Sequence, residues 1–192
     1  CTTVEGWFEN NASIKELVIG ENVAHIAGKA FSNCSGIVRV TIGKNVSQIG
    51  DKAFSSCHSL EGVYITDLSA WCNISFGGYS ANPLSYAGHL YLNGKHVTDL
   101  VIPDGVTEIK DYAFYDCGSL RSVTVPGTVV CIGTGAFSSC EYLATVINFS
   151  GLIFTAYSSD HGEIANNASV VVNAVNGEVV GDFVFGKVND VN

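Results

Sequence analysis

The segment KAFSNC at residues 29–34 returns three more times along the chain, as KAFSSC at 52–57, YAFYDC at 112–117 and GAFSSC at 135–140. Cys34 and Cys57 are 23 residues apart, and so are Cys117 and Cys140. The 60 residues from Cys57 to Cys117 equal two such repeats plus 14 inserted residues. A fixed period of this length indicates a solenoid, in which each repeat forms one coil and stacks on its neighbours.

One complete repeat, residues 37–59 (IVRVTIGKNVSQIGDKAFSSCHS), shows how a coil is built. Its apolar residues fit neither period 2 nor period 3.6 over the whole unit. Val40-Thr41-Ile42 alternates as a strand does, and the next residue is Gly or Pro in four repeats, which favours a bend with negative φ. We therefore expect a short strand, a bend, an extended stretch and a helical turn. The equivalent strands are expected at 17–19, 63–65, 100–102, 123–125 and 146–148.

The helical turn is expected to carry the Ala-Phe pair in its first turn and to end near the Cys. Asp51, Asp111 and Thr134 stand immediately before these segments, and such residues are good helix N-caps. Stacking should then place equivalent side chains in rows. The expected aromatic row is Phe31, Phe54, Phe114 and Phe137, and burial of one such ring contributes about 2–3 kcal/mol.

The repeated cysteines should form a second buried row, consisting of Cys34, Cys57, Cys117 and Cys140. We interpret them as small hydrophobic residues, because they lack His or carboxylate neighbours at metal-ligand spacing and no C-x-x-C motif occurs. Cys72 and Cys131 lie outside the row and are the better candidates for a disulfide, whereas Cys1 cannot be placed. Seven cysteines leave at least one thiol unpaired within the chain.

The regular pattern breaks between residues 66 and 96. DLSAWCNISF at 67–76 predicts a short helix capped by Asp67, and Asn93-Gly94 between two alternating runs predicts a type I′ hairpin. Four aromatic residues of this region are expected as local core more than as a binding patch: Trp71, Tyr79, Tyr86 and Tyr91. After Leu143 the repeat decays, and a last strand at 182–188 has no predicted partner, so the chain looks cut from a longer one.

Composition excludes several classes of protein. The 192 residues are 47% hydrophobic and 14% charged, which provides a large core, and the net charge is −9. The nine Lys and Arg residues are scattered, so neither nucleic acid nor an anionic membrane is an expected partner. Apolar runs are too short to span a bilayer. The chain begins without Met or a signal-peptide pattern, which suggests a processed or trimmed piece.

No motif for catalysis occurs, whether G-x-S-x-G, H-E-x-x-H or a phosphate-binding loop. We interpret the Asp160-His161 doublet as part of a polar loop, because the sequence offers no third partner for acid–base chemistry. The sequence therefore predicts a protein without catalytic activity, cofactor or metal.

Side chains that point outward from the predicted strands form the candidate binding face. This column reads Val18, Thr41, Tyr64, Val101, Thr124 and Ile147, and Glu16, Arg39, Asp99 and Ser122 flank it. Eight residues are the candidate protein-binding site: Val18, Arg39, Thr41, Tyr64, Asp99, Val101, Thr124 and Ile147. Stacked strands should present the column as one continuous stripe, and solenoids use such surfaces for extended protein contacts. A plain solvent face of β-forming residues, or a face covered by further chain, is the equal alternative.

The unit L-x-x-V-x-I-G/P-x-x-V-x-x-I-G-x-x-A-F-x-x-C resembles the BspA-type leucine-rich repeats over residues 14–149. The resemblance implies an α/β repeat solenoid, a right-handed leucine-rich-repeat superhelix with short strands on one face and short helical turns and loops on the other. We divide the chain into a lead-in (1–13), the repeats (14–149, with the irregular insertion and its β-hairpin at about 66–96) and a C-terminal cap with the start of a truncated β segment (150–192).

The same resemblance implies an extracellular protein, secreted or held at the surface of a bacterial cell. It suggests a non-catalytic adhesion module that binds a host or bacterial surface protein, as part of a larger bacterial protein. The alternative is a structural spacer that presents another domain and has no ligand of its own.

Overall fold

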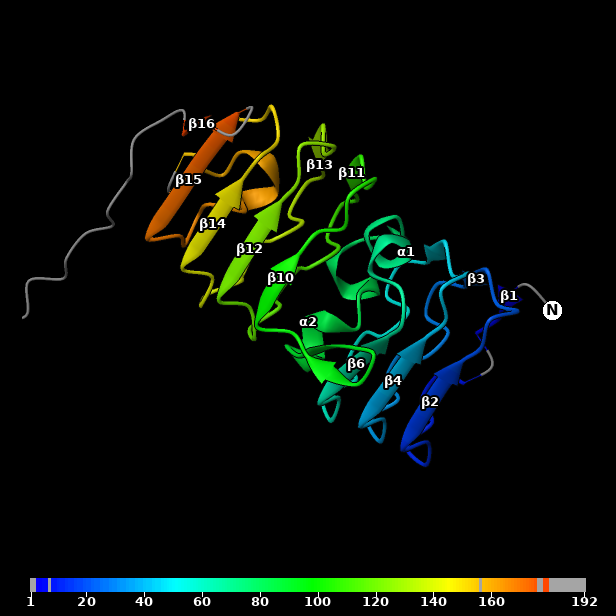
Figure 1. Cartoon of the computed structure of the whole chain (residues 1–192). Helices are drawn as coiled ribbons and strands as arrows, with labels where there is room; N and C mark the ends of the chain where they lie inside the picture. The colour runs from blue at the N-terminus through cyan, green and yellow to red at the C-terminus, as the bar shows by residue number, and fades with distance from the viewer. Residues whose placement is uncertain (1–2, 7, 156, 176–177, 180–192) are drawn as a thin grey trace, which may run out of the picture.

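A computed structural model describes residues 3–6, 8–155, 157–175 and 178–179 of the chain. Within them the chain winds into a solenoid, and successive coils place parallel strands side by side along one face (Figure 1). These strands are β2 (Glu16–Ile19), β4 (Arg39–Ile42), β6 (Gly62–Ile65), β8 (Leu90–Leu92), β10 (Asp99–Val101), β12 (Ser122–Val125), β14 (Thr145–Asn148) and β15 (Val170–Val175). The predicted repeat solenoid and its strand positions are confirmed.

The strands pair in the register that the 23-residue period predicts. Val40 of β4 lies opposite Leu17 of β2 and Val63 of β6. Val40 and Val63 are fully buried, whereas Arg39 is exposed and Thr41 and Tyr64, on the outward side of the strands, are half-buried. The alternation within each strand thus sends one side chain into the core and the next to the surface.

The extended stretch of each coil forms a second row of short parallel strands. One row contains β1 (Thr3–Val4), β3 (His25–Ile26), β5 (Gln48–Ile49) and β7 (Ser75–Phe76), and a separate pair contains β11 (Glu108–Ile109) and β13 (Cys131–Ile132). The inward residues of this row, such as Ile26, Ile49 and Ile109, are buried in the same core as the first row.

The Ala-Phe-x-x-Cys segments are turns, so the prediction of capped helical turns was wrong. Lys52 and Ser56 have positive φ (58° and 62°), and the other three segments have positive φ at the same two positions. Successive backbone N–H groups of a segment donate alternately within the coil and to the next coil. The Phe31 N–H donates to the Ala53 carbonyl of the next coil at 2.8 Å, and the Ser32 N–H donates to the Lys29 carbonyl of its own coil at 2.9 Å. A helix would keep all these donors within its own coil.

One of the expected N-caps, Asp111, has another role. The Asp111 side chain accepts a hydrogen bond at 2.7 Å from the backbone N–H of Thr134, which lies one coil further along. The Asp111 side chain thus joins neighbouring coils where the sequence suggested a helix start.

The aromatic row is confirmed in two parts. The rings of Phe31 and Phe54 stack with centroids 5.3 Å apart, and those of Phe114 and Phe137 stack at 5.1 Å. Phe8, which the repeat pattern did not mark, extends the first part by stacking on Phe31 at 5.6 Å. The inserted segment separates the two parts.

The insertion takes the place of an Ala-Phe-x-x-Cys turn. It contains α1 (Leu68–Cys72), η1 (Tyr79–Ala81), α2 (Leu84–Ala87) and β9 (Lys95–His96). Buried Trp71 donates from Nε1 to the Ala113 carbonyl at 2.9 Å, and buried Asn82 donates from Nδ2 to the Tyr112 carbonyl at 2.7 Å. These two side chains replace the backbone donors that a regular coil would supply to the next turn.

Three predictions for the insertion are tested directly. Asp67 caps α1 by accepting from the Ala70 N–H at 2.9 Å, as expected. Asn93 and Gly94 have φ of 51° and 75°, the signs that a type I′ turn requires, and they join β8 to antiparallel β9. Of the four aromatic residues, Trp71 is core, Tyr86 and Tyr91 are half-buried, and Tyr79 is 55% exposed, so local core was wrong for Tyr79.

The last Ala-Phe-x-x-Cys turn, at residues 135–140, is followed by a segment that lacks this motif and bonds to it. η2 (His161–Glu163) lies there, and the Gly162 carbonyl accepts from the Phe137 N–H at 2.8 Å. β15 continues the parallel row, and β16 (Glu178–Val179) pairs with it antiparallel. The strand expected at 182–188 lies outside the described residues.

Substitution of Phe54 by Ala should lower the free energy of unfolding by about 3–5 kcal/mol, because it removes a fully buried ring from the stacked row and leaves a cavity. Urea denaturation followed by circular dichroism measures this loss. Val130→Ala, at an exposed side chain, should stay within about 0.5 kcal/mol of the wild type. Equal losses in the two variants would contradict a core role for the aromatic row.

Candidate functional site

The eight predicted binding residues lie on two separate sheets. Strands β2, β4, β6, β8 and β9 form one sheet, and β10, β12, β14, β15 and β16 form the other. The antiparallel arm β9 pairs with β8 and so takes the edge to which β10 would otherwise bond. The expectation of one continuous stripe was therefore wrong: the inserted hairpin divides the outward column into two faces.

The first face, called here the N-terminal face, carries Val18, Arg39, Thr41, Tyr64 and Tyr91. Val18 pairs with Thr41, Thr41 with Tyr64, and Tyr64 with Tyr91, so their side chains follow one another across the sheet. Val18 is 66% exposed and Arg39 is exposed, whereas the other three are half-buried. Tyr91 was not among the residues predicted for the column, although its alternating run Leu90-Tyr91-Leu92 marks a strand with the tyrosine outward.

Two tyrosines dominate this face. The rings of Tyr64 and Tyr91 are 4.5 Å apart and within 11° of parallel. They lean over Gly62, where an added Cβ atom would lie 2.9 Å from Cε2 of Tyr91 and 3.1 Å from Cε2 of Tyr64. The missing side chain at Gly62 thus provides the space in which the two rings stack.

The second face, called here the C-terminal face, carries Asp99, Val101, Thr124, Ile147 and Val172. Val101, Thr124, Ile147 and Val172 pair in succession across β10, β12, β14 and β15. Val101 is 63% exposed. Sequence reasoning missed Val172, because its coil lacks the Ala-Phe-x-x-Cys signature that set the register elsewhere.

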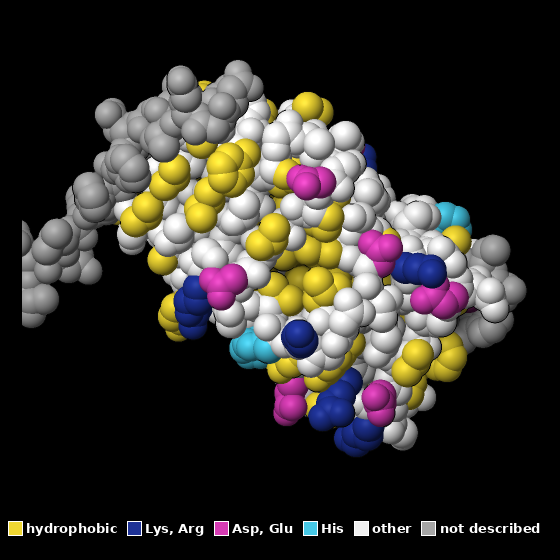
Figure 2. All heavy atoms as spheres, viewed as in Figure 1, with side chains coloured by type: hydrophobic (Ala, Val, Ile, Leu, Met, Phe, Trp, Pro, Cys, Tyr) yellow, Lys and Arg dark blue, Asp and Glu magenta, His cyan; other side chains and the backbone are white. Residues whose placement is uncertain are grey.

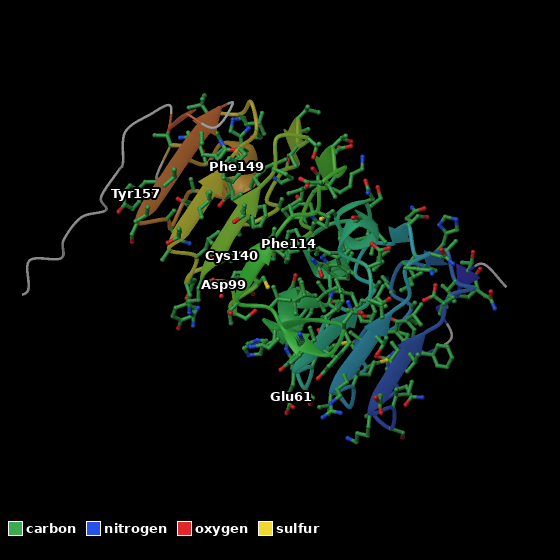
Figure 3. All side chains as sticks on the ribbon, in the orientation of Figure 1. Glu61, Asp99, Phe114, Cys140, Phe149 and Tyr157 are labelled. Atoms are coloured by element: carbon green, nitrogen blue, oxygen red, sulfur yellow. The ribbon has the colours of Figure 1, made fainter. Side chains whose placement is uncertain are left out.

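Polar and aromatic groups border the C-terminal face. Asp99 accepts hydrogen bonds from the hydroxyls of Ser122 and Thr98, which lower the pKa of its carboxyl group and keep it charged. Phe149, 46% exposed, directly follows β14 and lies at the other end of the strands from Asp99 (Figure 3). Arg121 lies over the Tyr142 ring at 4.6 Å. The face thus combines an aliphatic centre with charged and aromatic neighbours.

The two faces differ in character. Figure 2 shows hydrophobic side chains gathered over β12 to β15, while most charged side chains on this view lie over the hairpin and the N-terminal half. Several exposed large hydrophobic residues of the chain belong to its last third: Val130, Tyr142, Phe149, Ile153 and Tyr157. Exposed apolar surface with a polar border is typical of protein-interaction sites.

The four repeated cysteines are buried, and the thiols of Cys34, Cys57 and Cys140 each donate to a carbonyl of the preceding coil. Cys57 Sγ donates to the Phe31 carbonyl at 3.2 Å, and Cys140 Sγ donates to the Phe114 carbonyl at 3.1 Å. Burial raises the pKa of the Cys57 thiol to about 12, so it is protonated at neutral pH. The packing role predicted for this row is confirmed, with a hydrogen bond that the sequence did not reveal.

The suggested disulfide between Cys72 and Cys131 is absent, since both are free thiols. Cys72 is buried within the insertion, and burial raises its pKa to about 12. Cys131 is exposed on β13. Cys1 lies outside the described residues.

The Asp160-His161 doublet lies in a loop with local contacts. Asp160 accepts from the Ser158 hydroxyl at 2.9 Å, and the His161 ring packs near Phe154 with centroids 5.4 Å apart.

Across the described ranges, no group of three or more His, Cys, Asp or Glu side chains is arranged to hold a metal ion. No helix in this part of the chain is both long and apolar enough to cross a membrane.

A family model described as "BspA type Leucine rich repeat region" matches residues 3–81 and 88–186, in six copies. The chain belongs to the BspA-type leucine-rich repeat family. The match covers most of the 192 residues and includes both faces. A comparison with curated protein sequences gives no match.

Solved structures of bacterial leucine-rich repeat proteins are similar to this BspA-type chain. A Treponema pallidum leucine-rich repeat protein is 23% identical, with 88% of this chain and 61% of that chain covered and a TM-score of 0.36. A Bacteroides ovatus leucine-rich repeat protein is 26% identical, with 72% and 34% covered and a TM-score of 0.40. The chain thus spans less than two thirds of the length of either protein.

Thiol labelling should separate Cys131 from the buried row. In a Cys1→Ser variant, one thiol should react with a neutral-pH alkylating reagent in the native state, and all six described thiols should react after unfolding. Mass spectrometry counts and locates the labels. Additional substitution of Cys131 by Ser should abolish native labelling, and rapid native labelling of Cys57 or Cys140 would contradict their burial.

A double-mutant cycle should detect the tyrosine stack. Tyr64→Ala and Tyr91→Ala should show a coupling free energy of about 0.5–1.5 kcal/mol in urea unfolding, because the stacked rings contact each other directly. Val18→Ala combined with Tyr91→Ala provides the control, since these residues are separated by two intervening strands and should be additive. Additivity of the tyrosine pair would show that the stack contributes nothing to stability.

Proposed function

We propose that this BspA-type repeat region is a non-catalytic adhesion module that binds a host or bacterial surface protein. It acts outside the cell, secreted or held at a bacterial surface, as part of a larger protein. The observation that carries the proposal is the outward row of exposed and half-buried side chains across each sheet, which is aromatic on the N-terminal face and mainly aliphatic on the C-terminal face. A contiguous apolar surface with a polar border is a feature of sites that bind another protein.

The two faces suggest how contact with a protein is distributed. The C-terminal face offers apolar area at Val101, Ile147 and Val172, bordered by charged Asp99. The N-terminal face offers Arg39 and the tyrosine stack, and Arg and Tyr are enriched where binding energy concentrates. Parallel strands hold these side chains at fixed spacing, which lowers the entropy lost when a partner binds.

Substitution of Val101 by Glu should reduce binding to host extracellular-matrix proteins or bacterial cells by at least about tenfold, because a charge replaces the exposed valine on the edge strand β10 of the C-terminal face. Arg39→Glu combined with Tyr64→Ala tests the N-terminal face in the same way. Surface plasmon resonance with the immobilised repeat region measures both.

Val130→Glu is the matched control, since Val130 is a similarly exposed valine that lies outside both faces. It should leave binding unchanged. Folded face variants that bind as the wild type does would exclude these faces as the site. A wild-type protein that captures none of the probes would favour the spacer function instead.

A further inference from the structure

Two histidines meet on the outward side of the β8–β9 hairpin. Tyr91 of β8 lies opposite His96 of β9, and His89 precedes β8 by one residue. Alternation along the strand places His89 and Tyr91 on the same side, so His89 and His96 are diagonal neighbours across the two arms. The Asn93-Gly94 turn fixes the register that brings them together.

The distance between the two rings fits chelation of one ion. Nε2 of His96 lies 3.2 Å from Nδ1 of His89. Two nitrogen ligands bound at about 2.0–2.1 Å from one zinc ion are about 2.9 Å apart at a right angle and about 3.4 Å apart at the tetrahedral angle. Neutral tautomers with the protons on His89 Nε2 and His96 Nδ1 would leave both facing nitrogens free as ligands.

The surroundings keep the pair accessible and ordered. Both histidines are exposed, and the His96 ring packs against Tyr91 with centroids 5.0 Å apart, so the tyrosine stack supports one side of the pair. A surface depression of about 300 Å³ adjoins His96 and is lined by Leu92, Lys95, Val97, Thr98 and Asp99. An incoming ion and its water ligands therefore have open access from solvent.

Some nearby charged groups favour the binding of a metal cation to the two histidines, and others oppose it. Desolvation, His89 and Arg121 together lower the pKa of His96, which favours the neutral ring that metals require. The Arg121 guanidinium is held on the Tyr142 ring, and Asp99, whose pKa is lowered, places a carboxylate in the same depression as His96. Lys95 adds a positive charge to the same depression.

We propose that His89 and His96 form a two-histidine site for a divalent transition metal ion such as Zn²⁺ or Ni²⁺, on the exposed side of the hairpin. Imidazole nitrogen is a preferred ligand of these ions. Two protein ligands leave the remaining coordination positions to water. The site is independent of the surface-protein partner proposed above.

Isothermal titration calorimetry with ZnCl₂ tests the site in a Cys1→Ser, Cys131→Ser background, which removes the exposed thiol and the thiol outside the described residues. One zinc ion per chain should bind. Either His89→Gln or His96→Gln should weaken binding at least about tenfold, since each removes one of two ligands and loss even of outer-shell partners costs that much. Ring ¹H–¹⁵N spectra should shift at both histidines and not at His25.

His25→Gln is the matched control, because His25 is an exposed histidine on β3, in the other row of strands. It should bind zinc with wild-type affinity. Far-UV circular dichroism verifies that each variant is folded. Zinc binding that survives both hairpin substitutions, or the absence of zinc binding at about millimolar concentration, would overturn the proposal.

Discussion

Hydrogen bonding between equivalent residues of successive coils is the constraint on which this solenoid depends. The strands pair in a 23-residue register, and the turns after them add further bonds, such as Phe31 N–H to the Ala53 carbonyl. This pairing sets each side chain beside its counterpart from the next coil. Each side chain must therefore pack beside the equivalent side chain of the next coil. Phenyl rings such as Phe31 and Phe54 do so by stacking, and the Cys57 thiol does so while donating to a carbonyl of the preceding coil.

The same requirement explains why the repeated Ala-Phe-x-x-Cys segment is not helical. A helix would use consecutive N–H groups inside one coil, and the next coil would then have no donors to pair with. The left-handed backbone conformation of Lys52 and Ser56 bends the chain so that alternate backbone N–H groups point to the neighbouring coil. At the second position Asn33 and Asp116 are residue types that tolerate positive φ at low cost, whereas Lys29, Lys52 and Tyr112 adopt positive φ at the first position without that preference.

The insertion at residues 66–96 changes the surface more than the core. Trp71 and Asn82 supply hydrogen bonds that a regular coil would make with its backbone, so stacking continues through the irregular region. On the outward side, however, β9 closes the first sheet, and the second sheet starts anew at β10. The BspA-type region therefore presents two faces of different character, with a histidine and tyrosine cluster at the hairpin between them.

The sequence alone determined the period, the strand positions, the Phe and Cys rows, the α1 cap and the hairpin turn, because each follows from local spacing or from a residue type with one strong preference. It could not determine the shape of the Ala-Phe-x-x-Cys turn, since an aspartate such as Asp111 suits both a helix cap and a hydrogen bond to the next coil. Only the tertiary structure decided that Phe8 joins the aromatic row, that Cys72 is buried and free, and that the outward column is divided. These features depend on which strand edge the hairpin occupies and on contacts between residues far apart in the chain, and a repeat pattern specifies neither.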